Sequence, residues 1–415
     1  MNQSRSLMSI FVVILSALLL IGLVWGNYRF TEYNIAGEGF SIQWISIRSL
    51  VTTGNSPYSD LVTTQIQESV KGENSFSTEN SPRYTSPLYS GVVILPFALL
   101  ENKTLAHTLW STIQFVIILL ILLFSLKITA WKPAWFTFFL YLLFTIFNYH
   151  VVMPWLDGGL SIWASLFLVL AFLAINNNRN EIGGVFLGLA AIQPLMVVLS
   201  VVFILIWAAS QRRKLLILWF FITVIFLSVI GLFLVPDWII QYIRLVYKFQ
   251  QYFPTGTPGV FFSNTWPGVG RQLGWLVSGA SAVILIIEWW VALRKDFRWF
   301  LWTACITIVI SQWIGIPTIP GNFVGLILPM VLISAMFTER WSRGGQLIAV
   351  LMSLLLFIWQ WSIYYSDLTS SQPNMQLNLI FPLPLVLLIG LYWVRWWVIK
   401  PKRLLIEELR LGESY

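Results

Sequence analysis

Twelve runs of apolar residues, separated by short polar stretches, make up most of the chain. A helix that crosses a bilayer needs about 20 apolar residues; the longest runs reach that length, whereas the shortest reach about half of it. The runs lie at residues 8–26, 105–126, 134–150, 159–175, 182–192, 195–209, 214–235, 272–293, 299–316, 322–337, 346–364 and 377–397. This pattern predicts an all-α polytopic membrane protein with about 12 transmembrane helices.

The basic residues between these runs predict which side of the membrane each loop occupies. If successive runs cross in opposite directions, 17 of the 25 lysine and arginine residues fall on one side. Cytoplasmic loops are enriched in these residues, so this side is predicted to be cytoplasmic, together with both termini. We therefore expect a multi-pass protein of the plasma membrane whose polar outer loops form the active face.

One apolar segment, residues 87–100, does not fit the alternation. It is about 14 residues long, which is short for a span, and it contains Pro96. If it crossed the membrane, the basic clusters at 127–132 and 212–214 would move to the outer side, against the charge rule. We therefore expect this segment to lie on the outer leaflet or to dip into it.

The first outer segment then runs from about residue 27 to 104 and is the most polar stretch of the chain. Its residues 40–52 have the pattern of a short interfacial helix. Four apolar residues share one face of that helix: Phe40, Trp44, Ile47 and Val51. We expect this helix to lie along the membrane surface.

A second unusual segment is the apolar stretch 182–209, which Gln193–Pro194 interrupts. Basic residues bound it at Arg179 and at 212–214, so both of its ends should be cytoplasmic. Two short helices in a hairpin fit this pattern, each about 20 Å long at 1.5 Å per residue. Irregular backbone at that depth needs polar partners, so the pattern predicts a cavity that opens outward.

Further outer loops are expected at 236–271, 317–322 and 364–376. On this basis we divide the chain into a core, residues 1–240, and a second part, residues 241–415. The second part holds the large outer loop, the last spans and a basic cytoplasmic tail. No internal repeat is evident, although such repeats are common in transporters.

Composition supports the membrane assignment. The chain is 58% hydrophobic and only 10% charged, with a mean hydropathy of +0.78, which excludes a soluble domain of this size. The net charge of +8 follows from the cytoplasmic excess of basic residues and does not require a nucleic acid partner. Cys305 is the single cysteine, so no internal disulfide can form.

Several kinds of site lack support in the sequence. The two histidines, His107 and His150, belong to no His/Cys cluster, so we expect no zinc site and a structural role for both. No phosphate-binding loop and no dinucleotide fingerprint is present. A divalent cation held by outer carboxylates stays an open alternative. Glu288 lies in an apolar run close before Arg294, so we expect its carboxylate to reach the cytoplasmic interface.

Three outer carboxylates are candidates for a catalytic base: Glu38, Asp60 and Asp157. Glu38 precedes the predicted interfacial helix, Asp60 follows a turn, and Asp157 stands before two glycines at the outer mouth of a helix. A carboxylate near the membrane surface can accept a proton from a hydroxyl acceptor. The alternative for Glu38 and Asp60 is a solvated loop charge, and for Asp157 a helix cap.

The outer loops also contain candidates for substrate binding. A guanidinium can bind a lipid-linked phosphate through two hydrogen bonds and stabilise it as a leaving group. The alternative is non-specific contact with lipid headgroups. The candidates are Arg83, Tyr84, Gln193, Arg244, Lys248 and Arg271. A base and a phosphate-binding cation together favour sugar transfer from a lipid phosphate, because nucleotide sugars are not available on the outer face.

Four segments carry a resemblance to a known family: GFSIQWISIRSLVTTGNSPYSD (39–60), RYTSPLYSGVVILPFALL (83–100), WLDGGLSIW (155–163) and GGVFLGLAAIQPLMVVL (183–199). Their order resembles the GT-C superfamily of polytopic glycosyltransferases, in particular glycosyltransferase family 87, the alpha-mannosyltransferase-like group. The resemblance covers roughly the first 240 residues. It implies juxtamembrane helices in the first outer loop and short helices that frame an outward cavity.

The chain departs from the family pattern at three places. The resemblance implies an aspartate as catalytic base at the start of the first segment, where this chain has Gly39 preceded by Glu38. A lysine is often found before the hairpin proline, where this chain has Gln193. A Gly-Gln-x-Asn piece is replaced by residues 157–160. Either Glu38 or Asp157 then takes over as base, or the chemistry has changed or been lost.

The resemblance and the loop chemistry together predict a membrane glycosyltransferase. It would transfer a sugar, with mannose as the first candidate, from a polyprenyl-phosphate donor to a lipid-linked or cell-surface glycan. Its partners would be membrane lipids, the polyprenyl-phosphate sugar and the glycan acceptor. Two alternatives stay open: a transporter or flippase of lipid-linked glycans, and a non-catalytic membrane protein derived from the GT-C fold.

Overall fold

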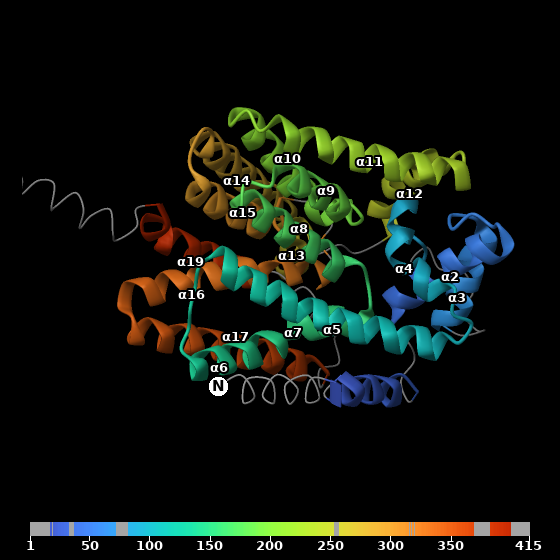
Figure 1. Cartoon of the computed structure of the whole chain (residues 1–415), viewed down its shortest axis with the longest axis horizontal. Helices are drawn as coiled ribbons and strands as arrows, with labels where there is room; N and C mark the ends of the chain where they lie inside the picture. The colour runs from blue at the N-terminus through green and yellow to red at the C-terminus, as the bar shows by residue number, and fades with distance from the viewer. Residues whose placement is uncertain are drawn as a thin grey trace, which may run out of the picture. The chain divides into compact units, whose positions relative to one another are not determined.

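The computed structural model describes residues 17–18, 20–32, 37–71, 82–252, 257–314, 316, 318, 320–368 and 382–399 (Figure 1). All regular secondary structure in these ranges is helical, which confirms the predicted all-α class. Six helices are long and apolar enough to cross a membrane, and a seventh span results if one bent helix pair counts as a single unit. The chain is therefore a polytopic membrane protein.

The six long spans coincide with six of the predicted apolar runs. They are α5 (Lys103–Ile128), α11 (Lys214–Leu234), α14 (Gly270–Ala292), residues Gly321–Trp341 including α16 (Ile327–Trp341), α17 (Arg343–Leu368) and α19 (Pro382–Ile399). Large apolar side chains on α11 and α14, among them Phe226, Phe233 and Ile286, are exposed, as expected of surfaces that face lipid.

The remaining predicted runs form shorter or bent helices. They are α6 (Trp135–Ile146) with α7 (Tyr149–Asp157), α8 (Ser161–Asn176), α9 (Asn180–Ala190), α10 (Pro194–Ser210) and α15 (Phe297–Ile310). The α6–α7 pair is bent by 53° at its break, so the run predicted at 134–150 continues as a second helix to Asp157. Most of the run at 8–26 lies outside the described residues.

The chain forms two compact units. The first contains the described residues up to Tyr84, Ser90–Val116 and Trp155–Gly159; the second contains Thr85–Tyr89, Ile117–Pro154 and the described residues from Leu160 onward. The division of the chain near residue 240 stays a prediction.

In the first unit, α2 (Glu38–Thr53) packs against α3 (Asp60–Lys71) and α4 (Gly91–Ala98). The predicted helix at 40–52 is therefore present, and Gly54 ends it with a left-handed φ of 72°. Phe40, Trp44 and Ile47 are buried as expected, whereas Val51, in the last turn, is 46% exposed.

The segment at 87–100 does not form a single spanning helix. It folds as a 3₁₀ turn, η1 (Leu88–Ser90), followed by α4, whose 8 residues rise only about 12 Å at 1.5 Å per residue. The Trp44 indole N–H donates to the Phe97 carbonyl at 3.0 Å. Arg48 donates to the carbonyls of Ala98 and Leu100 at 3.1 and 3.0 Å, which satisfies the end of α4.

In the second unit, α9 packs between α8 and α11 (Figure 1). Gly184 and Gly188 allow this close approach, because a Cβ at either position would overlap the backbone or side chains of α11. Small residues four positions apart are typical of tightly packed helices in membranes. The predicted interruption at Gln193–Pro194 is observed, with Pro194 as the first residue of α10.

Glu288 is buried and has a distant partner that the sequence did not indicate, while its position relative to the interface stays a prediction. Its carboxylate is buried and forms a 2.9 Å salt bridge with Arg395. It also accepts a 3.1 Å hydrogen bond from the Tyr392 hydroxyl. Both partners lie on α19, far along the chain, so the local charge pattern gave no sign of them. A paired and hydrogen-bonded carboxylate is the form in which a buried charge is tolerated.

Candidate carboxylate site

The Asp157 carboxylate lies against the start of α2. Its Oδ1 accepts a hydrogen bond of 3.0 Å from the Gly39 backbone N–H, although 118 residues separate the two in sequence. Gly39 is the second residue of α2, so its N–H has no partner within the helix. The α2 N-cap, Gly37, offers no side chain of its own, and Asp157 replaces it as the capping group.

Three glycines allow the two segments to approach so closely. A Cβ on Gly39 would overlap the Asp157 carboxylate, and one on Gly37 would overlap the backbone of Leu156 and Asp157. Gly158 has a φ of 74°, a left-handed conformation, and a Cβ there would meet the Phe40 side chain. The Asp157 carboxylate thus occupies the space that the Cβ of any other residue at position 39 would fill.

Residues of α5 hold the 155–159 segment in place from the other side. Trp110 Nε1 donates to the Gly158 carbonyl at 2.8 Å, and Gln114 Nε2 donates to the Gly159 carbonyl at 2.7 Å. Trp155 Nε1 in turn donates to the carbonyl of Ser111 at 2.8 Å. These three bonds fix the turn that presents Asp157, so its carboxylate is held on both sides by rigid helices.

Asp157 is the last residue of α7, so it lies at the very end of the bent pair that would form a seventh span and outside the six long spans. The residue is exposed, although protein atoms crowd its carboxyl group. The crowding disfavours the charged form and raises the pKa of Asp157 to about 6, and the nearby charge of Glu38 adds to the rise. Hydrogen bonds from the N–H groups of Gly39 and Gly159 oppose it. The carboxyl can therefore exchange a proton near neutral pH.

His107 lies beside this site and was expected to be structural. Its ring stacks on Phe40, with centroids 4.6 Å apart and an angle of 27° between the planes. It is 4% exposed, and neither ring nitrogen has a hydrogen-bond partner within the described part of the chain. A buried imidazole beside the start of α2 is a feature that the sequence pattern did not distinguish from an ordinary core residue.

The other predicted carboxylates are more open. Glu38 is exposed in the first turn of α2, next to Gly39, so the structure brings Glu38 and Asp157 together around one backbone position. Asp60 is exposed at the start of α3. Among the described residues, no group of three or more His, Cys, Asp or Glu is arranged to hold a metal ion.

The predicted substrate-binding residues occupy several elements. In the first unit, Arg83 is partly buried, and the buried Tyr84 hydroxyl bonds to Ser90 Oγ at 3.0 Å. In the second unit, Gln193 is the N-cap of α10 and Arg271 is an exposed residue near the start of α14. Arg244 is exposed on α12 (Trp238–Tyr252), which also carries Lys248, whose side chain lies outside the described set. Their roles stay predictions.

A comparison with known families identifies the relatives of this chain. The model of glycosyltransferase family 87 matches residues 84–317, which is more than half of the 415 residues. The match includes Asp157 and begins after Glu38 and Gly39. No curated protein and no solved structure matches the chain. This polytopic membrane protein, with its fixed carboxylate at the start of α2, therefore belongs to glycosyltransferase family 87.

Proposed function

We propose that the chain transfers a sugar, with mannose as the first candidate, from a polyprenyl-phosphate donor to a hydroxyl of a lipid-linked or cell-surface glycan. The reaction would take place at the outer face of the plasma membrane, with Asp157 as the base. One observation carries the proposal. The Asp157 carboxylate fills the space next to Gly39, the position at which the family resemblance implies a catalytic aspartate. A carboxylate is thus retained in that place although it comes from another segment.

The proposed step is a displacement at the anomeric carbon of the donor sugar. Asp157 accepts the proton of the acceptor hydroxyl, and the acceptor oxygen forms the new glycosidic bond. The bond between the anomeric carbon and the phosphate oxygen breaks, and its electron pair leaves with polyprenyl phosphate. The reaction consumes one sugar donor and one acceptor hydroxyl and needs no further reactant.

Two features favour Asp157 over Glu38 as the base. Asp157 is fixed by a backbone hydrogen bond and by the turn that α5 holds, whereas Glu38 is an exposed side chain on the first turn of a helix. A base works best when it is held in one orientation and when its pKa lies near the working pH. The raised pKa of Asp157, about 6, meets the second condition.

The leaving phosphate needs a cation, and Arg83, which lies in the same unit as Asp157, is the first candidate. Two arginines of the second unit are further candidates for binding a lipid phosphate. Arg244 lies on α12, whose 15 residues combine apolar and polar faces, as expected of a helix that lies at a lipid surface. Arg271 is exposed at the start of α14. Either guanidinium could pair with a lipid phosphate through two hydrogen bonds. Lys248 and Gln193 are the remaining candidates for substrate binding.

Reconstituted full-length protein tests the donor directly. We expect it to transfer labelled mannose from polyprenyl-phosphate mannose to a membrane glycolipid extract and to release polyprenyl phosphate. A nucleotide sugar offered at the same concentration should give no product. Transfer from the nucleotide sugar and none from the polyprenyl donor would refute the donor class. Polyprenyl-phosphate glucose and galactose, run in parallel, decide which sugar is accepted.

The pH dependence of this transfer provides a separate prediction. A protonated Asp157 cannot accept the acceptor proton, so the rate should fall as the pH is lowered through about 6. Initial rates between about pH 5 and pH 8 measure this, with a melting curve at each pH to confirm that the protein stays folded. A rate that is constant over this range in a folded protein would exclude a base with the pKa of Asp157.

A further inference from the structure

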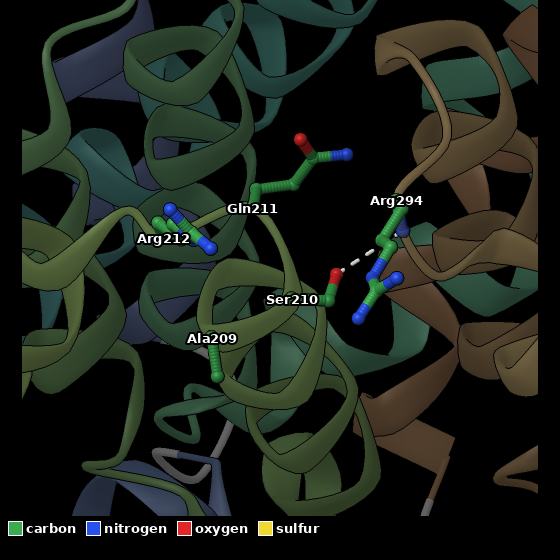
Figure 2. Close-up of a pocket in the computed structure, with 5 residues that line it drawn as sticks. All are labelled: Ala209, Ser210, Gln211, Arg212 and Arg294. Carbon is green, nitrogen blue, oxygen red and sulfur yellow. Dashed lines mark hydrogen bonds between the residues drawn. The ribbon is translucent and has the colours of Figure 1, made fainter.

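A second candidate site lies in the second unit, where two helix connections meet. Here α10 turns into α11, and the connection from α14 to α15 lies beside it. Between them is a pocket of about 450 Å³ lined by Ala209, Ser210, Gln211, Arg212 and Arg294. Figure 2 shows one arginine on each connection, with Ser210 between them. None of these residues belongs to the carboxylate site.

Two hydrogen bonds join the connections that form the pocket. The Arg294 backbone N–H donates to Ser210 Oγ at 3.2 Å (Figure 2). Gln211 Nε2 donates to the Lys295 carbonyl at 2.6 Å. The two arginine backbones are therefore held at fixed positions, and the pocket does not depend on the chance meeting of two mobile loops.

Both arginines stand at backbone positions that do not favour them. Arg212 has a φ of 57° and Arg294 a φ of 59°, in the left-handed region just after a helix end. Glycine or asparagine is the usual residue there, because a larger side chain costs free energy in this conformation. Ala130, Asn178 and Ser342 adopt the same conformation after other helix ends, but only the two arginines line this pocket.

The pocket has a positive charge from its two arginines. No carboxylate among the described residues forms a salt bridge with Arg212 or Arg294. The neighbouring Arg213 behaves differently. Its guanidinium donates to the Ile175 carbonyl and to Asn178 and Asn180, and it stacks on Trp207 at 4.9 Å. The Arg213 guanidinium is thus hydrogen-bonded within the fold, whereas Arg212 and Arg294 are exposed and line the pocket.

We propose that this pocket binds a phosphate group, the anion that paired guanidinium groups recognise best. The phosphate could belong to a lipid headgroup or be free in solution. The surroundings make a lipid the first candidate. The pocket lies at the ends of two spans, α11 and α14, whose nearby residues Leu215, Leu218 and Trp290 are exposed and apolar. Basic pockets between spanning helices are known to hold anionic headgroups.

Binding of defined probes to the purified full chain tests the proposal. A short-chain phosphatidylglycerol is the lipid probe, inorganic phosphate is the free anion, and a phosphatidylcholine of equal chain length is the neutral-headgroup comparison. Affinities are measured by titration in a neutral detergent. Phosphatidylglycerol should bind more tightly than phosphatidylcholine. Each of Arg212→Gln and Arg294→Gln should weaken its binding about fivefold, and the double variant about 25-fold.

Arg179→Gln is the matched control, because Arg179 is an exposed arginine at another helix connection and does not line the pocket. It should leave the affinity unchanged. Arg212→Lys should retain part of the affinity, which provides a folded variant if the glutamine variants are unstable. Binding of inorganic phosphate that depends on the two arginines supports the site with a free anion as ligand. The proposal is overturned if neither probe depends on Arg212 and Arg294, or if Arg179→Gln weakens binding equally.

Discussion

Replacing Asp157 with asparagine is expected to lower the rate of sugar transfer by about 10²–10⁴, the usual contribution of a general base. Asparagine keeps an oxygen that can accept the Gly39 N–H, so the cap of α2 should survive. It cannot accept the acceptor proton at any working pH. The substitution therefore separates catalysis from capping. The initial rate with the polyprenyl-phosphate donor measures catalysis, and a melting curve shows whether the cap of α2 is kept.

Glu38→Gln is the matched control for this experiment. It removes a carboxylate that lies one residue from Gly39 but is exposed and outside the hydrogen bond. We expect a much smaller loss of rate than for Asp157→Asn. If Asp157→Asn transfers sugar at the rate of the native chain, Asp157 is only a helix cap. If Glu38→Gln is inactive in the same assay, Glu38 is the base and the role assigned to Asp157 is wrong.

The fold class followed from local patterns because each spanning helix has its own signal. The run at 214–235 is observed as α11, Lys214–Leu234, and the interruption at Gln193–Pro194 is observed between α9 and α10. Both features are set by residues that are neighbours in the sequence, so the sequence pattern alone predicts them. Length was less predictable. The run at 134–150 ends its first helix at Ile146 and continues as α7 after a bend of 53°, where Asn148 Oδ1 accepts the His150 N–H at 3.1 Å.

The candidate site could be predicted only in part. Glu38 and Asp157 were selected as outer carboxylates, but nothing local to either residue shows that they meet around Gly39, because 118 residues lie between Gly39 and Asp157. The closeness of the Asp157 carboxylate to position 39 becomes visible only in the structure, where a Cβ on Gly39 would overlap that carboxylate. Glycine at 39 is then a requirement of the arrangement, since any side chain there would displace Asp157.

Glu288 shows the same limit for a charge within a span. The sequence offered only the nearby Arg294 as a guide to its surroundings, whereas the carboxylate pairs with Arg395, 107 residues away on α19. A transporter would be expected to keep an ionisable group of this kind available to a substrate. Here both carboxylate oxygens are engaged, one by Arg395 and one by Tyr392. The pairing favours a structural role for Glu288 over a role in binding a transported substrate.

Replacing Glu288 with alanine is therefore expected to destabilise the protein by about 3–5 kcal/mol. The substitution leaves the Arg395 guanidinium without its carboxylate partner. The Arg395 side chain is only 29% exposed and stacks on Trp302 at 4.9 Å, so water cannot fully replace that partner. An unpaired charge in such surroundings costs more than the lost bond itself. Unfolding of the purified chain in detergent, followed by a thermal or chemical transition, measures the change.

Two further variants show whether the effect comes from the unpaired charge. Glu181→Ala removes an exposed carboxylate in the first turn of α9 and should change the stability by less than about 0.5 kcal/mol. Glu288→Met combined with Arg395→Met replaces both charges by apolar side chains and should recover most of the loss. If Glu288→Ala unfolds at the same temperature or denaturant concentration as the native protein, the ion pair does not contribute to stability and α19 is held by its apolar contacts. If the double methionine variant is as unstable as Glu288→Ala, the loss comes from packing and not from the buried charge.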